Sequence, residues 1–261
     1  MNTMDLFRLD GQIAVVTGAA RGLGRQMAVA LADAGADIAF CDLLEDESRQ
    51  TLALIEQRGR RCFFKRVDVT RSDEIEAFVT EVIGRFGGID ILVNNAGRES
   101  EGCPIEEVTD DLWRNIIEVN LSGMFYFARA VGRRMIDRKQ GGSIINISSI
   151  SGQIVSKIFP RHNVTYGVSK AGAAYLTRGL ASEWATHNIR VNAIAPGYML
   201  TPNNQTSRKF PEIVARIIEM TPLHRYGQDD ELNGLVVFLA SKASSFMTGS
   251  TVTIDGGHTI W

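Results

Sequence analysis

The sequence has few cysteines, and their arrangement argues against two classes of protein. Cys41, Cys62 and Cys103 are an odd number and form no Cys-x-x-Cys pair, so neither a disulfide framework nor a zinc site is indicated. The four histidines show no helical spacing of metal ligands. We therefore expect no bound metal. Reduced thiols also favour a cytoplasmic location.

The chain also lacks a strong charge excess and long apolar runs. Its net charge is −2, so no general basic field favours nucleic acid or an anionic membrane. No stretch of about 18 apolar residues is present, and the N-terminus lacks the basic segment and apolar core of an export signal. We expect a partner that is a small molecule, with no nucleic acid and no membrane.

Short apolar, β-branched segments alternate with longer amphipathic segments along the 261 residues. The segments that favour strands are 13–16, 37–41, 61–66, 89–93, 143–147, 190–194 and 251–254. Those that favour helices are 25–34, 72–86, 109–137, 165–187 and 230–241. This alternation predicts an α/β fold, because βαβ units build parallel sheets. We expect one doubly wound, Rossmann-type domain over residues 1–261, with a mostly parallel seven-stranded sheet and helices on both faces.

A glycine-rich loop at residues 17–24 follows the first predicted strand and runs into a helix. Glycines let the backbone approach a pyrophosphate, which the helix N-terminus stabilises. The second strand ends at Asp42, about where a carboxylate binds ribose hydroxyls. A structural turn and a helix cap are the alternative interpretations, but the order of elements favours a dinucleotide site. The contacts that we expect here are Gly18, Arg21, Gly22, Leu23, Gly24 and Asp42.

The segment that begins at Tyr166 and ends at Lys170 places a tyrosine and a lysine on one helix face, because residues i and i+4 are neighbours. A nearby lysine cation, together with a positive nicotinamide ring, lowers a tyrosine pKa from its usual value of about 10. Tyr166 would then act as base when an alcohol is oxidised and as acid when a ketone is reduced. None of the other four tyrosines has a lysine four residues later, which argues against an accidental match.

These segments together resemble the short-chain dehydrogenase/reductase family. The loop at 17–24 is similar to its Thr-Gly-x-x-x-Gly-x-Gly signature, and residues 94–97 are similar to its Asn-Asn-Ala-Gly segment. The landmarks run from residue 13 to 257 in family order. The resemblance implies an oxidoreductase that uses a nicotinamide cofactor on a secondary alcohol or ketone. The further cofactor contacts that it implies are Asp68, Val69, Asn95, Ala96, Gly97, Tyr166, Lys170, Pro196, Gly197 and Thr201.

The resemblance also implies roles for a serine and an asparagine. Ser149, in a Ser-x-x-Gly frame, would hydrogen-bond the substrate oxygen, and Asn120 would complete a proton relay, although a buried core amide is an equal alternative for Asn120. The stretch from Ser149 to Tyr166 is longer than is usual in the family and reshapes the substrate pocket. We expect substrate contacts at Ser151, Gln153 and Tyr198, a substrate lid over residues 196–222, and a further cover of the pocket at residues 98–103.

The identity of the cofactor depends on charge at Asp42. A 2′-phosphate of NADP about 4 Å from this carboxylate would cost roughly 4 kcal/mol at an effective dielectric near 20. Leu43 supplies no compensating base, although Arg21 could reach toward such a phosphate. We therefore predict NAD as the cofactor.

The Ala-Pro-Gly-Tyr-Met turn at residues 195–199 and the C-terminal tail at 255–261 resemble the polyol, sugar and sugar-acid dehydrogenases of the family. The polar segment 201–209 favours a hydroxyl-rich ligand, because a buried hydroxyl left unpaired costs about 1–3 kcal/mol, and ordinary solvated lid surface is the alternative interpretation. A 3-oxoacyl-thioester reductase, which would prefer NADPH and an apolar channel, is the alternative enzyme. A catalytically silent NAD-binding regulator is the alternative from another class. Family members like this chain usually form homotetramers through two long helices and the tail. Here these are segments 109–137 and 165–187 and the apolar end at Ile260 and Trp261.

Overall fold

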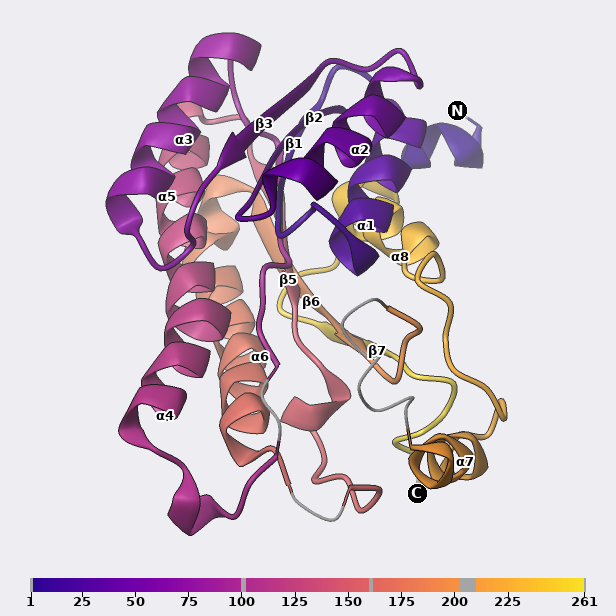
Figure 1. The fold of residues 1–261 in the computed structure, drawn as a ribbon. Coiled ribbons are helices and arrows are strands. Elements are labelled where there is room, and N and C mark those ends of the chain that lie inside the picture. The colour runs from indigo at the N-terminus through magenta and orange to yellow at the C-terminus, as the bar shows by residue number, and fades with distance from the viewer. Residues whose placement is uncertain (1, 100–101, 160–161, 202–209, 261) are drawn as a thin grey trace.

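The structure, a computed structural model, describes residues 2–99, 102–159, 162–201 and 210–260 (Figure 1). Within these residues a seven-stranded sheet has the order β3-β2-β1-β4-β5-β6-β7. Its strands are β1 (Ile13–Thr17), β2 (Asp37–Asp42), β3 (Cys62–Arg66), β4 (Ile91–Asn94), β5 (Gly142–Ile147), β6 (Ile189–Pro196) and β7 (Thr251–Ile254). All six strand pairs are parallel, so the doubly wound α/β fold is confirmed and the sheet is wholly rather than mostly parallel.

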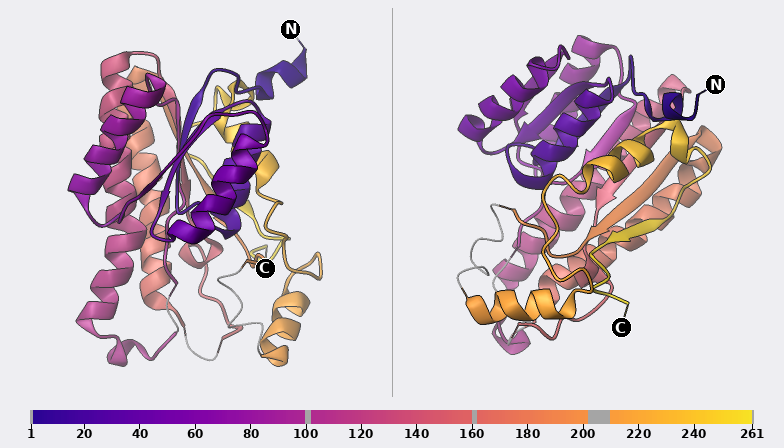
Figure 2. Two further views of the ribbon diagram at one scale, coloured as in Figure 1. Left: turned by 45° about the horizontal axis from the view of Figure 1, so that its top comes forward. Right: turned by 90° about the vertical axis from the view of Figure 1, so that its right-hand side faces the viewer.

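Helices cover both faces of the sheet (Figures 1 and 2). Helices α1, α2 and α8 pack on one face, and α3, α5 and α6 pack on the other. The bounds are α1 (Gly22–Asp33), α2 (Glu45–Glu56), α3 (Ser72–Phe86), α4 (Asp110–Ile117), α5 (Gly123–Arg138), α6 (Val164–Trp184), α7 (Pro211–Met220) and α8 (Asn233–Ala240). Among the described residues, no helix combines the length and apolar character that a membrane span requires.

Strand β1 illustrates why the strands have continuous apolar sequences. All five of its residues are buried. Ala14 and Val16 belong to the core beneath α1 and α8, whereas Ile13 and Val15 belong to the core beneath α3 and α5. Because successive side chains point to opposite faces, a strand covered on both sides needs apolar residues at every position.

Three helical features differ from the prediction. Helix α2 was not predicted, because its sequence is mostly polar and it buries only Ser48, Thr51 and Ile55. The predicted helix 109–137 is instead α4 and α5, joined by a π-helical segment over Glu118–Ser122. Helix α7 was not predicted and lies within the segment 196–222 that was predicted as a substrate lid, and residues 202–209 of that segment lie outside the described residues.

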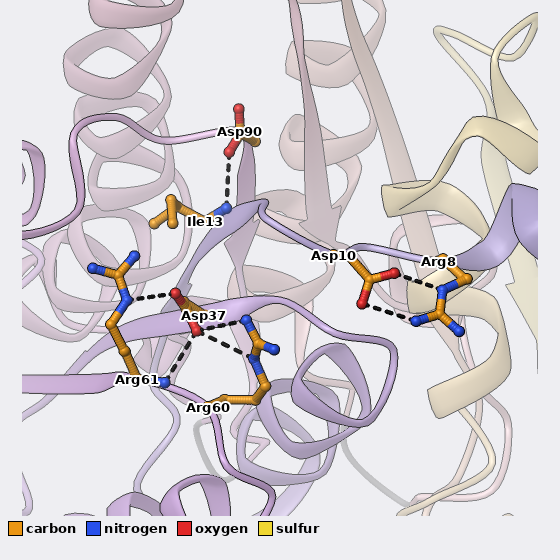
Figure 3. A network of polar contacts seen from close by, with 7 residues as sticks. All are labelled: Arg8, Asp10, Ile13, Asp37, Arg60, Arg61 and Asp90. Atoms are coloured by element: carbon orange, nitrogen blue, oxygen red, sulfur yellow. Dashed lines mark hydrogen bonds and ion pairs between the residues drawn. The ribbon is translucent and has the colours of Figure 1, made fainter.

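A network of charged side chains lies at the amino ends of β1 and β2 (Figure 3). Asp37 is 5% exposed and accepts hydrogen bonds from the guanidinium of Arg60 at 2.9 Å and from that of Arg61 at 2.6 Å. Burial raises the pKa of Asp37, but hydrogen bonds from Arg61 and the charges of both arginines outweigh it, so the pKa is lowered overall. Asp90 accepts a hydrogen bond from the Ile13 backbone at 2.8 Å. These contacts therefore tie neighbouring segments together at this edge.

Candidate active site

A cavity of about 390 Å³ opens at the carboxyl ends of the strands. Strand β1 lies between β2 and β4 in the sheet, so the chain crosses to opposite sides there, and such a switch point leaves a crevice for ligands. The predicted residues that line the cavity are Gly18, Arg21, Gly22, Leu23, Gly24, Asp42, Asp68, Val69, Asn95, Ala96, Gly97, Ser149, Tyr166, Lys170, Pro196 and Thr201. The fold therefore brings most of the predicted residues, which are distant in the sequence, together around one cavity.

The glycine loop leaves backbone exposed at the start of α1. Gly18 has φ +67° and Gly22 has φ +56°, values that favour glycine. A Cβ on Gly24 would lie 2.1 Å from the Gly18 oxygen, so no side chain fits there. Arg21 precedes α1, and no side chain among the described residues caps the helix. Its first backbone N–H groups are thus left to bind an anion, which fits a cofactor with a pyrophosphate.

The loop is fixed to the end of β4 by Thr17 and Asn95. The Thr17 hydroxyl accepts hydrogen bonds from the backbone N–H groups of Asn95 at 3.0 Å and Ala96 at 2.9 Å. The Asn95 side-chain amide donates to the carbonyl oxygens of Thr17 at 3.0 Å and Gly18 at 2.8 Å. These hydrogen bonds therefore fix the glycine loop relative to the segment that follows β4, although the two are far apart in the sequence.

Asp42 holds a fixed carboxylate at one end of the cavity. Its oxygens accept hydrogen bonds from the backbone N–H groups of Ala20 at 2.9 Å, Leu43 at 2.7 Å and Leu44 at 3.1 Å. Arg21 lines the same cavity, but no ion pair between Arg21 and Asp42 occurs among the described residues. The local charge that is fixed in position is thus negative.

Tyr166 and Lys170 lie on the first turns of α6. The ammonium of Lys170 lies 5.6 Å from the centre of the Tyr166 ring and donates a hydrogen bond to the Ile147 carbonyl oxygen at 2.8 Å. Lys170 is 4% exposed. Burial lowers the pKa of Lys170 to about 8, and the charge of Glu99 opposes this shift. A tyrosine next to a buried lysine at the end of a cavity can exchange a proton with a bound alcohol or ketone.

Ser149 faces Tyr166 from just beyond the end of β5. Its side chain is buried, and its hydroxyl accepts a hydrogen bond from the Ser151 backbone at 3.1 Å. Burial raises the pKa of Tyr166, the charge of Glu99 acts in the same direction, and a hydrogen bond with Ser149 opposes them. The lowered tyrosine pKa that the sequence suggests is therefore not a property of the protein alone.

Asn120 lies behind the cavity wall, on the π-helical segment, and is completely buried. Its side-chain oxygen accepts from the Arg98 backbone N–H at 2.7 Å, and its amide donates to the Arg98 carbonyl oxygen at 2.9 Å and to the Ser169 hydroxyl at 3.1 Å. A Cβ on Gly97 would lie 3.5 Å from the Asn120 oxygen and 3.6 Å from the Lys170 ammonium. Asn120 is thus a satisfied amide beside Lys170, and its place in a proton relay stays a prediction.

Some predicted contacts do not belong to the described cavity wall. These are Gly197, Ser151, Gln153 and Tyr198. The Gln153 side chain hydrogen-bonds the Thr253 hydroxyl at 3.1 Å, and the Tyr198 hydroxyl bonds that of Ser156 at 3.0 Å. Their contacts with substrate or cofactor stay predictions.

Arg98, Glu99 and Met199 also line the cavity, and they lie within the segments 98–103 and 196–222 that were predicted to cover the pocket without being named individually. The sequence signal available for the first two was their position directly after the Asn-Asn-Ala-Gly segment.

The sequence of this chain is similar to a known protein family and to individual dehydrogenases. The family described as Enoyl-(Acyl carrier protein) reductase matches residues 18–259. Galactitol 2-dehydrogenase of Rhizobium johnstonii is 42% identical over 261 residues, which is 100% of both chains. The 2-dehydro-3-deoxy-D-gluconate 5-dehydrogenase of Escherichia coli K12 is 39% identical over 254 residues, covering 97% of this chain and 98% of the relative.

The fold is also similar to that of a solved dehydrogenase. The crystal structure of a gluconate 5-dehydrogenase from Burkholderia cenocepacia J2315, in complex with NADP and tartrate, superposes with a TM-score of 0.93. The two sequences are 36% identical, and the match covers 100% of both chains.

Proposed function

The chain belongs to the short-chain dehydrogenase/reductase family, and we propose that it transfers a hydride between NAD(H) and a secondary alcohol or ketone of a polyol, sugar or sugar acid. As a member of this family, it is an oxidoreductase. The observation that supports the proposal is a single cavity with the glycine loop and Asp42 at one end and Ser149, Tyr166 and Lys170 at the other. A hydride carrier and a proton carrier are both needed for this reaction, and the cavity offers a place for each.

The proposed chemistry assigns the proton to Tyr166. In alcohol oxidation the Tyr166 phenolate takes the hydroxyl proton, and in ketone reduction the phenol returns it to the oxygen. Ser149 donates a hydrogen bond to the substrate oxygen and stabilises negative charge on it. Lys170 holds a positive charge near Tyr166 and would bind the cofactor ribose. NAD, when bound, supplies the hydride acceptor, and its positive ring favours the phenolate.

NAD as the preferred cofactor is supported by the fixed carboxylate of Asp42. Three backbone N–H groups hold it in place by hydrogen bonds. A 2′-phosphate beside it would meet a like charge, whereas ribose hydroxyls can donate hydrogen bonds to it. The bound NADP in the gluconate 5-dehydrogenase makes NADP the competing cofactor for the assay below.

The substrate class is supported by relatives of two kinds, one named for a polyol and one for a sugar acid. The competing substrate is a 3-oxoacyl thioester, in keeping with the description of the matched family. The competing function of another class, a silent NAD-binding regulator, has no use for a half-buried Tyr166 beside a buried Lys170 at the cavity wall.

We further propose a homotetramer, formed through α4, α5 and α6 and through the C-terminal tail. Support comes from large apolar or aromatic side chains that are solvent-exposed on these elements, among them Trp113, Phe125, Tyr175 and Ile260. Trp261 lies outside the described residues. Light scattering at micromolar concentration tests this, because a monomeric mass would exclude it. A cytoplasmic location stays a prediction, consistent with the free thiols of Cys41, Cys62 and Cys103.

A spectrophotometric screen tests the proposed function. Galactitol, D-gluconate and a 3-oxoacyl thioester are each supplied with the matching redox form of NAD and of NADP, and the change in reduced cofactor is followed. We expect turnover of a polyol or sugar acid, faster with NAD. Turnover of the thioester alone would favour the alternative enzyme. Tight NAD binding without turnover would favour the regulator.

A further inference from the structure

The cavity holds a carboxylate that the proposed reaction does not use. Glu99 follows the Asn-Asn-Ala-Gly segment and lines the same cavity wall as Ser149, Tyr166 and Lys170. Neither the proton transfer to Tyr166 nor the contacts that the family resemblance implies give it a role. A carboxylate at the reacting end of a cavity must still influence which molecules enter, because its charge acts over several ångströms.

The backbone that carries Glu99 is fixed from within the protein. The residue before it, Arg98, has both its N–H and its carbonyl oxygen bound by the Asn120 side chain, at 2.7 Å and 2.9 Å. Asn120 itself is completely buried. Glu99 is therefore presented at the cavity by an anchored segment.

The charge of Glu99 reaches the reacting groups. Burial is the largest influence on the pKa values of Tyr166, Lys170 and Tyr198, and the Glu99 charge raises all three. Arg98 lines the same cavity. The negative charge of Glu99 therefore acts on the groups at this end of the cavity together with the opposite charge of Lys170.

Within the described parts of the chain, Glu99 is not paired with an oppositely charged side chain. No ion pair within 4.0 Å joins it to Arg98 or Lys170 among the residues described. Its side chain stays accessible to solvent through the open cavity, although surrounding protein atoms raise its pKa. An accessible carboxylate can accept hydrogen bonds from hydroxyl groups, and it repels a second carboxylate.

We propose that Glu99 selects neutral polyols and sugars over sugar acids, by accepting a hydrogen bond from a substrate hydroxyl and repelling a substrate carboxylate. This inference rests on the proposed function and narrows it to one of its substrate classes. Two carboxylates roughly 6 Å apart at an effective dielectric near 20 correspond to about a 100-fold discrimination, which solvent in the open cavity reduces toward about 10-fold. Glu99 is a specificity-determining residue in this account and takes no part in proton transfer.

The test compares Glu99→Gln with Glu106→Gln as a matched control. Glu106 carries the same charge and is exposed like Glu99, but it does not line the cavity. For each protein, kcat/KM is measured with galactitol and with D-gluconate. We expect wild type to prefer galactitol. Glu99→Gln should shift the ratio toward gluconate by about 10- to 100-fold, mainly through gluconate, and Glu106→Gln should leave it unchanged.

Tartrate binding keeps the inference testable if no alcohol is turned over. Such a result would contradict the proposed function, whereas tartrate affinity of the NADH-loaded protein, followed by NADH fluorescence, reports repulsion alone. We expect Glu99→Gln to bind tartrate about 10- to 100-fold more tightly than wild type. A wild-type preference for gluconate, a substrate ratio within about threefold of wild type in Glu99→Gln, or unchanged or undetectable tartrate binding in that variant would overturn the inference.

Discussion

At the amino edge of the sheet, buried charge is paired with opposite charge, whereas at the carboxyl edge charged groups face a cavity. Asp37 at the amino edge contacts two arginines (Figure 3). At the carboxyl edge, no ion pair of Asp42, Glu99 or Lys170 occurs within the described parts of the chain. Backbone groups hold Asp42 and Lys170 instead.

The difference separates stability from function. A carboxylate between two guanidinium groups uses its hydrogen-bonding capacity within the protein. Removing the carboxylate leaves the two arginines without their opposite charge, which destabilises the fold. A carboxylate or ammonium held by backbone groups keeps its net charge available for a ligand. We therefore expect substitutions at the amino edge to change the free energy of unfolding, and substitutions at the carboxyl edge to change turnover or cofactor choice.

The largest expected effect is at Tyr166. Tyr166→Phe removes the proposed acid and base but preserves the ring, so kcat should fall about 10²- to 10⁴-fold while NAD affinity and melting temperature stay near wild type. Steady-state kinetics and thermal melts measure both. Tyr175→Phe is the control, because Tyr175 lies on the same helix but is 72% exposed. Near-normal turnover in Tyr166→Phe would refute the proposed acid–base role.

Cofactor choice is expected to change next most strongly, through Asp42. Asp42→Ala removes the hydrogen-bond acceptor for ribose hydroxyls and the repulsion of a 2′-phosphate, so kcat/KM for NAD should fall roughly 10- to 150-fold relative to NADP. A further Leu43→Arg substitution should favour NADP outright. Kinetics with both cofactors at fixed substrate measure the ratio. If wild type already prefers NADP, the charge argument fails and Arg21 takes its place.

At the amino edge, Asp37→Asn should lower the free energy of unfolding by about 1–3 kcal/mol and leave kcat/KM within about twofold of wild type. Denaturant unfolding and steady-state kinetics measure the two quantities. Asp33→Asn is the control, because Asp33 pairs with Arg58 at 2.6 Å but its side chain is 56% exposed, and exposed pairs contribute little. Equal losses in the two variants would show that burial of Asp37 does not matter.

The pH dependence of this difference has a defined sign. The pKa of Asp37 is lowered in the folded protein, so its stabilising contribution is present above its unfolded pKa and is lost as pH falls through its folded pKa. The stability gap between wild type and Asp37→Asn should therefore narrow in acid. A gap that widens with falling pH would contradict the pairing.

The smallest expected effect concerns Lys170. It is a stabilising contribution that appears as pH rises into the alkaline range, whereas that of Asp37 is lost as pH falls into the acid range. Burial lowers its pKa to about 8 in the folded protein, so the unfolded chain holds the proton more tightly above this pH. The free energy of unfolding of the cofactor-free protein should rise by about 1 kcal/mol between roughly pH 8 and 9 through this group. Lys170→Met should lack this contribution. Parallel pH profiles for the two proteins would mean that Lys170 keeps its ordinary pKa.

The sequence predicted the sheet and most of the cavity wall because their signals are local. Apolar runs mark strands that are buried on both faces, and glycines mark a backbone that a ligand approaches. Helix α2 was not predicted because it buries few apolar side chains, so its apolar periodicity is weak. The π-helical segment escaped because a change of helical hydrogen bonding at Asn120 leaves no compositional trace. Glu99 was expected only as part of the pocket cover 98–103, because its own place beside Tyr166 at the cavity depends on the fold.

Transfer of a deuterium label tests the central claim most directly. The best secondary alcohol of the screen is deuterated at the carbon that bears the reacting hydroxyl and is incubated with NAD, and the reduced cofactor is analysed by mass spectrometry and NMR. The account predicts NADH that carries deuterium at the nicotinamide ring, formed by wild type and nearly absent with Tyr166→Phe. NADH without the label, or equal labelled NADH from Tyr166→Phe, would contradict it.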